Sequence, residues 1–110
     1  MIEETLKKIE ARVRDADSIA GDRKIELLEL LSTLHSEVAA LAQTHREHAE
    51  SIASFTDLST REATRTQRNP RLLELSRAGL SSSVEEFEQS HPRLVEIVNA
   101  ISNALASLGI

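Results

Sequence analysis

The chain has 110 residues, a formal net charge of −5, and a composition that is 40% hydrophobic but only 2% aromatic. Its core must therefore be built from aliphatic side chains. The absence of cysteine excludes disulfides and thiolate metal sites. Three glycines and two prolines provide little turn chemistry for β-hairpins. The sequence predicts a single all-α domain over residues 1–110.

The amino-terminal segment gives no sign of export or membrane insertion. Residues 1–4 are acidic and lead directly into a helical pattern, without the basic and apolar regions of a signal peptide. No stretch approaches the ~20 apolar residues that a membrane-spanning helix needs. We therefore expect a soluble cytoplasmic protein with no membrane partner.

Hydrophobic periodicity predicts about four helices, at residues 3–20, 22–67, 70–90 and 92–108. The apolar stripe of the first helix consists of Ile2, Leu6, Ile9, Val13, Ala16 and Ala20. Gly21 is suited to the position just after a helix, and Asp22 is suited to cap the next one. This tight turn predicts that the first helix folds back along the second.

The second predicted helix, over residues 22–67, is the spine of the expected fold. Its apolar positions alternate in steps of four and three, and we call them the seam: Leu27, Leu31, Leu34, Val38, Leu41, His45, His48, Ile52 and Phe55. A continuous helix of this length would extend roughly 65–70 Å. After Leu58 the seam positions become polar, so residues 56–68 are expected to form an exposed helical end or a partly ordered linker.

Two prolines mark the later helices. Asn69 as the N-cap and Pro70 at the first position begin the third helix. The step from His91 to Pro92 predicts a break, because a residue before proline avoids the α region. The helices together predict an elongated bundle, or a coiled-coil-like hairpin, built on one long central helix.

A spine this long exposes more seam than the other helices of one chain can cover. We therefore expect a homodimer whose driving force is helix-on-helix burial. The predicted interface consists of Leu31, Leu34, Val38, Leu41, His45, His48, Ile52 and Phe55. The main hypothesis is a non-catalytic, homo-oligomeric protein–protein interaction or structural module.

His45 and His48 are unusual members of the seam. Imidazoles three residues apart in a helix can share a metal ion, to which Glu47 or Glu50 might add an oxygen ligand. A metal site usually needs three or four convergent ligands, and only two are well placed here. The main interpretation is a pair of packing imidazoles without a cofactor. The alternative is a small metal- or pH-responsive regulator that uses these two residues.

Two further patterns invite a functional interpretation. Glu88 and His91 form one Glu-x-x-His pair, the half-motif of carboxylate-bridged di-metal bundles, but no second copy exists and we interpret the pair as a coincidence.

Residues 59–77 carry five arginines against two glutamates, and this basic island consists of Arg61, Arg65, Arg68, Arg71 and Arg77. It could contact phosphate. The acidic chain lacks stacking aromatics and a DNA-binding motif, which favours a solvated face and no nucleic-acid partner.

The sequence contains no pattern typical of catalysis. There is no nucleophile–base arrangement, no glycine-rich phosphate loop and no pair of carboxylates expected to be buried together. We therefore expect that the protein is not an enzyme.

Several segments resemble one known family. They are HAESIA at residues 48–53, Asn69-Pro70, FEQSHPRL at residues 87–94 and ALASLGI at residues 104–110. With them, roughly residues 25–110 resemble a small bacterial family known as domain of unknown function 4404, most specifically at the SHPRL step and the LGI end. The resemblance implies a short, helical, soluble bacterial protein. It implies no activity, cofactor or catalytic residue, but it directs interest to His48 and His91.

Overall fold

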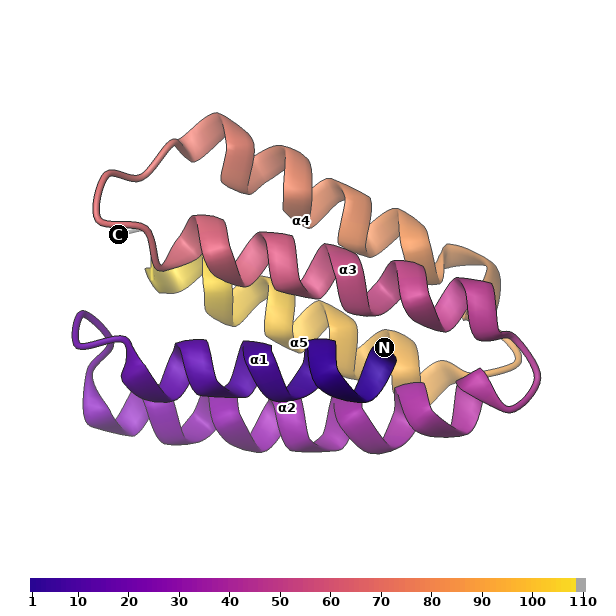
Figure 1. The fold of residues 1–110 in the computed structure, drawn as a ribbon. Helices are drawn as coiled ribbons and strands as arrows, with labels where there is room; N and C mark the ends of the chain where they lie inside the picture. Colours follow the sequence, from indigo (N-terminus) through magenta and orange to yellow (C-terminus); the bar gives the residue numbers. More distant parts are fainter. Residues whose placement is uncertain (109–110) are drawn as a thin grey trace.

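The computed structural model describes residues 1–108, which form five α-helices and one short 3₁₀ helix (Figure 1). The elements are α1 (Ile2–Asp15), α2 (Gly21–Ala42), α3 (Arg46–Ala63), α4 (Pro70–Val84), η1 (Glu85–Phe87) and α5 (Pro92–Leu108). The predicted all-α class is confirmed. The longest dimension is 37 Å, so the fold is a compact bundle, and the expected elongated coiled-coil-like shape is not observed.

The predicted single helix over residues 22–67 is wrong, because residues 43–45 separate α2 from α3. The backbone leaves the helical region at His45, where φ is −136° and ψ is 64°. The His45 N–H still donates to the Leu41 carbonyl at 2.8 Å, which closes the last turn of α2. The chain then folds back so that α3 packs against α2. Leu41 and Ile52, on either side of the break, are therefore buried in one core.

Helix α3 occupies the centre of the bundle, because α1, α2, α4 and α5 all pack against it. Even its polar side chains are covered, with Thr56 and Thr60 fully buried and Glu62 only 6% exposed. The hydroxyls of Thr56 and Thr60 donate to the carbonyls four residues earlier, each at 2.8 Å, which satisfies both donors inside the helix. The predicted exposed end or linker at residues 56–68 is therefore wrong for residues 56–63.

Helix α1 packs along α2 and α3 through its predicted apolar stripe. Ile2, Leu6, Ile9 and Val13 are buried, but the helix ends at Asp15 and not near Ala20. Residues 16–20 form the turn, in which Ile19 is buried. Gly21 begins α2 and does not end α1, so that part of the prediction is wrong.

The start of α4 follows the sequence-based expectation. The Asn69 side chain accepts hydrogen bonds from the N–H groups of Arg71 and Leu72 at 3.1 and 3.2 Å, and Pro70 occupies the first helical position. The helix ends at Val84 and is followed by η1, so the predicted extent to residue 90 is too long. Helix α5 has the predicted bounds, and it packs on α2, α3 and α4.

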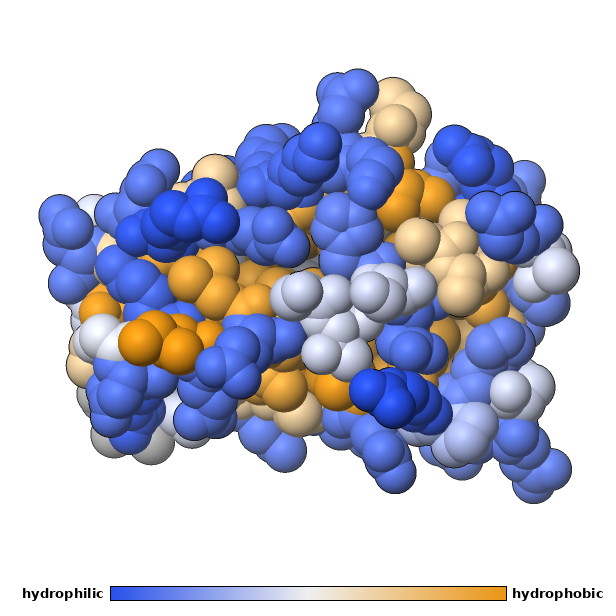
Figure 2. All heavy atoms as spheres, turned by 90° about the horizontal axis from the view of Figure 1, so that it is seen from below, coloured by the Kyte–Doolittle hydropathy of each residue, from blue (hydrophilic) through white to orange (hydrophobic). Residues whose placement is uncertain are grey.

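The aliphatic part of the seam predicted as a dimer interface lies inside the chain's own core, whereas His45 is exposed and His48 and Phe55 are partly buried. Leu31, Leu34, Val38, Leu41 and Ile52 are each no more than 2% exposed. The uncovered seam that led to the expectation of a homodimer is thus covered by the chain's own helices. The surface below α1 and α2 is mainly hydrophilic, with apolar atoms visible in separate patches (Figure 2).

Close packing of α3 on α4 gives a first testable prediction. A methyl group added at Gly79 would overlap the ring of Phe55, whose Cδ1 would lie at 2.6 Å. Overpacking costs about 1–3 kcal/mol, whereas alanine improves helix propensity by about 1 kcal/mol. We expect Gly79→Ala to lower the free energy of unfolding in urea by up to about 2 kcal/mol.

The matched control for this prediction removes the ring. In a Phe55→Ala background, Gly79→Ala should raise the free energy of unfolding, because only the gain in helix propensity remains. Equal stabilisation by Gly79→Ala in both backgrounds would contradict the close contact.

Candidate functional site: a histidine cluster around Phe87

Two turns at the same end of the bundle bring three histidines together (Figure 1). His45 lies in the turn between α2 and α3, and His48 lies in the first turn of α3. Phe87 is the last residue of η1, and His91 immediately precedes α5. We refer to these four residues as the histidine cluster.

Phe87 is the centre of the histidine cluster. Its side chain is only 3% exposed, and its ring centroid lies 5.4 Å from that of His45, 5.3 Å from His48 and 5.5 Å from His91. The ring planes are nearly perpendicular in all three pairs, at 81° to 89°. This edge-to-face arrangement is one that aromatic rings prefer at such distances. His45 also lies 6.0 Å from His48 and 6.1 Å from His91.

His45 and His91 occupy equivalent positions in their local sequences. The carbonyl of His45 accepts from the N–H of Ala49 at 3.0 Å, and the carbonyl of His91 accepts from the N–H of Val95 at 3.3 Å, so each residue begins a helix. A hydroxyl residue precedes each of them. The Thr44 hydroxyl lies 2.8 Å from His45 Nδ1, and the hydroxyl before His91 lies 2.9 Å from its Nδ1. These contacts orient both rings toward Phe87.

The three imidazoles of the cluster lie close enough for positive charges on them to repel one another. Helix N-termini carry positive partial charge, and His45 and His91 each lie at one. Two protonated rings about 6 Å apart repel by roughly 0.7–3 kcal/mol for effective dielectric constants between about 80 and 20. One acidic group offsets this repulsion, since Glu86 Oε1 lies 3.0 Å from His48 Nε2. Both side chains of that pair are about half exposed, so solvent screens their attraction.

His45 and His48, the candidate metal ligands, lie next to each other in the structure, but both pack against the ring of Phe87. Within residues 1–108, no group of three or more histidine, aspartate or glutamate side chains is arranged to bind a metal ion. His91 of the Glu-x-x-His pair contacts His45 and Phe87. Each of the three histidines is noticeable in the sequence, but no local pattern marks Phe87 as the ring they share.

His35 lies away from the cluster and joins α2 to α1. Its Nε2 donates to the carboxylate of Glu3, at 2.8 Å from Oε2, and its Nδ1 lies 3.7 Å from Glu10 Oε1. The hydrogen bond from His35 lowers the pKa of Glu3 below its ordinary value, against a smaller opposing effect of desolvation. The positive charges of His35, Lys7 and the amino terminus add to the lowering.

Three arginines of the basic island make contacts within the chain. Arg61 and Arg65 pair with Asp57 and Glu62, at 3.3 and 2.9 Å. Arg77 of α4 donates from Nε to the carbonyl and hydroxyl oxygens of Ser102 in α5, at 3.0 and 3.1 Å. Arg68 and Arg71, which extend from the loop into α4, are exposed, as are Arg61 and Arg65.

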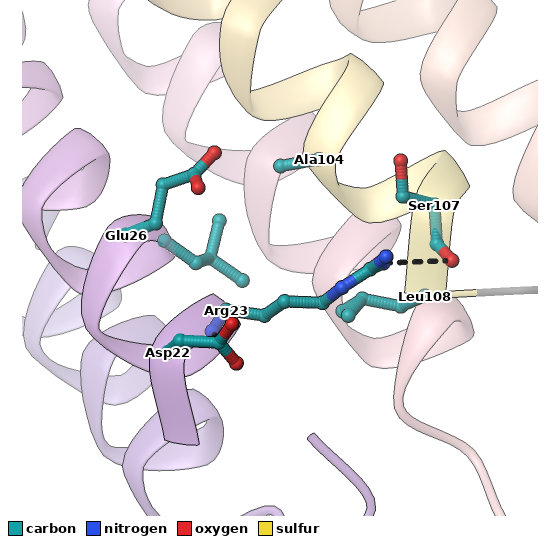
Figure 3. A pocket seen from close by; sticks show the side chains of 7 residues that line it. Asp22, Arg23, Glu26, Ala104, Ser107 and Leu108 are labelled. Atoms are coloured by element: carbon teal, nitrogen blue, oxygen red, sulfur yellow. Dashed lines mark hydrogen bonds between the residues drawn. The ribbon is translucent and has the colours of Figure 1, made fainter. Parts of the chain in front are cut away.

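A hollow of about 290 Å³ lies where α2 begins and α5 ends (Figure 3). Asp22, Arg23 and Glu26 line it on one side, and Ala104, Ser107 and Leu108 line it on the other. Arg23 reaches across and donates to the Ser107 carbonyl at 3.4 Å. The lining mixes two carboxylates with one guanidinium and brings no base to a nucleophile. The hollow therefore offers no chemistry that competes with the histidine cluster.

The fold and the cluster define an all-α bundle with an aromatic–imidazole contact at one end. The chain belongs to the family described as "Domain of unknown function (DUF4404)", whose family model matches residues 27–110. The predicted resemblance is thereby confirmed, and α1 precedes the matched region. No curated protein and no solved structure matches the chain.

None of the helices in residues 1–108 combines the length and apolar composition that crossing a membrane requires.

The lowered pKa of Glu3 gives a pH-dependent prediction. Because its pKa is lower in the folded chain than in the unfolded one, its contribution to stability is complete above the unfolded pKa of about 4.3. That contribution is lost as the pH falls through the folded pKa. We expect Glu3→Gln to reduce the loss of stability between about pH 5 and pH 3, measured by urea unfolding.

The control for Glu3 is its neighbour. Glu4→Gln removes the same formal charge without removing the partner of His35. It should therefore lose as much free energy of unfolding as the wild type between about pH 5 and pH 3. Identical profiles for Glu3→Gln and the wild type would show that the pair with His35 does not contribute.

Proposed function

We propose that this protein is a non-catalytic helical module that associates with copies of itself, in an interaction or structural role. The observation that supports this is a set of exposed leucines on helices whose other leucine, isoleucine and valine side chains are buried. Leu58 in α3 is 38% exposed, and Leu72 and Leu75 in α4 are 42% and 54% exposed. A single exposed leucine needs no explanation, but several together favour a binding surface.

The packing of α3 on α4 supports a common location for these leucines. The two helices are joined by a short connection and run in opposite directions (Figure 1). The ring of Phe55 packs on Gly79. Leu58 lies about one turn after Phe55, and Leu75 lies about one turn before Gly79, so they occupy neighbouring turns of the pair.

The experiment for this proposal measures mass against concentration. Sedimentation equilibrium at neutral pH, from about 1 μM to about 1 mM protein, covers the affinities of weak complexes. We expect the mean mass to rise from that of one chain toward that of two. A mass of one chain over the whole range would contradict self-association.

A second candidate is a pH-responsive regulator. We propose it because Phe87 and His91 join the two histidines of the seam, so that protonation would place several positive charges around one phenyl ring. Repulsion among these charges would loosen the contact between the two turns. Such loosening would affect the α2–α3 turn, on which the packing of α3 depends.

Its test compares stability at two pH values. Between about pH 8 and pH 5, we expect the wild type to lose more free energy of unfolding than His45→Gln/His91→Gln, because only the wild type gathers the additional positive charges around Phe87. His35→Gln lies outside the cluster and serves as the matched control, which should retain the wild-type difference. The same loss in the wild type and the double variant would exclude the cluster as a pH-sensitive element.

A further inference from the structure

We propose that the binding surface is the outer face of α4, and that two copies pair there with their α4 helices antiparallel about a two-fold axis. This inference rests on the self-association proposed above. It adds the partner's orientation and the residues that determine it.

The outer face of α4 is a distinct stripe. The buried side chains of this helix are Leu73, Ser76, Leu80 and Val84. On the opposite side, Leu75 is followed by Ala78 and Ser82, which are also exposed, while Leu72 lies seven residues before Gly79 and so at the edge of this face toward α3. Positions 75, 78 and 82 are three and seven residues apart, so they share one face of the helix. The stripe therefore has large side chains in its first half and small ones in its second.

This division of sizes favours antiparallel pairing. Two parallel helices would place leucines against leucines and small residues against small residues, which leaves a gap. Antiparallel helices place Leu75 of one copy, with Leu72 at its edge, against Ala78 and Ser82 of the other. A two-fold axis repeats each of these contacts, because the same surface is used by both copies.

The charges at the two ends of α4 select the same orientation. Arg68 and Arg71 lie at its beginning, and Glu85 and Glu88 follow its end; all four side chains are exposed. Helix α4 has 15 residues and is therefore about 22 Å long, more than twice the Debye length of about 8 Å at physiological salt. The charges at one end of α4 therefore interact mainly with the charges at whichever end of the partner's α4 lies beside them. Antiparallel pairing puts arginines beside glutamates twice, whereas parallel pairing puts like charges together.

The predicted complex is weak. Leu75 of each copy, with Leu72 at its edge, forms a small apolar centre, in the range below about 1,200 Å² of buried surface that transient complexes have. We expect a dissociation constant of about 10 μM to 1 mM that rises with salt concentration, because charge pairs at the rim contribute.

The first test compares two exposed apolar side chains by sedimentation equilibrium. Leu75→Glu should weaken association at least about tenfold. Ile25→Glu, in α2 at a side chain that is 61% exposed, is the matched control and should leave association unchanged. Circular dichroism and urea unfolding should show that both variants remain folded. A wild type that stays monomeric overturns the proposed function and this inference together, whereas an equally strong dimer in Leu75→Glu overturns only the α4 interface.

The second test addresses orientation. Arg68→Glu/Arg71→Glu makes both ends of α4 acidic, and it should abolish self-association if pairing is antiparallel. Mixing it with Glu85→Lys/Glu88→Lys, whose ends are both basic, should restore a mixed dimer at least as strong as that of the wild type. An unchanged dimer in the arginine variant alone would contradict antiparallel pairing. In a parallel dimer, identical ends of α4 lie together in the wild type and in the variant, so the substitution would add no new contact between like charges.

Discussion

The fold depends on the requirement that α3 be covered by four other helices. Ala49, Ile52 and Ala53 are at most 1% exposed, and no single neighbouring helix can enclose them. The turn at residues 43–45 meets this requirement, because it returns the chain so that α2 lies against α3. Helix α1 then packs on both, and α4 and α5 cover the remaining sides. A straight α2–α3 helix would separate the two halves of the seam and leave each without its partner.

Heptad periodicity identified the buried aliphatic side chains of the seam, but it also included the exposed His45 and it did not show where the chain bends. Leu31, Leu34, Val38, Leu41 and Ile52 were all assigned to the buried seam, and all are buried. The register continues through His45, and residues 22–69 contain no glycine or proline to indicate an end. The one local signal is the T-x-x-E spacing from Thr44 to Glu47, which is typical of a helix start. Similarly, the polar side chains of Ser59 and Glu62 suggested exposure, because a sequence pattern does not show that neighbouring helices cover them.

The candidate site was predictable only as separate residues. His45 and His48 stood out because imidazoles replace aliphatic side chains in the seam, and His91 stood out because it precedes Pro92. Their common contact with Phe87 depends on two turns that are some forty residues apart in sequence and meet only after α3 has folded back. The same holds for Arg77, which counted as part of a basic island until its contact with Ser102 in α5 was known. Local patterns identify such residues, whereas tertiary packing determines their neighbours.

The bend between α2 and α3 is the central claim, and a spin-label distance tests it most directly. The chain has no cysteine, so Asp22→Cys/Arg61→Cys provides two unique nitroxide positions near the start of α2 and the end of α3. Double electron–electron resonance, on labelled protein diluted with unlabelled protein, measures the distance within one chain. The bundle predicts one distance below about 40 Å, since its longest dimension is 37 Å. A distance near the roughly 58 Å spanned by a continuous helix over these residues would contradict the account.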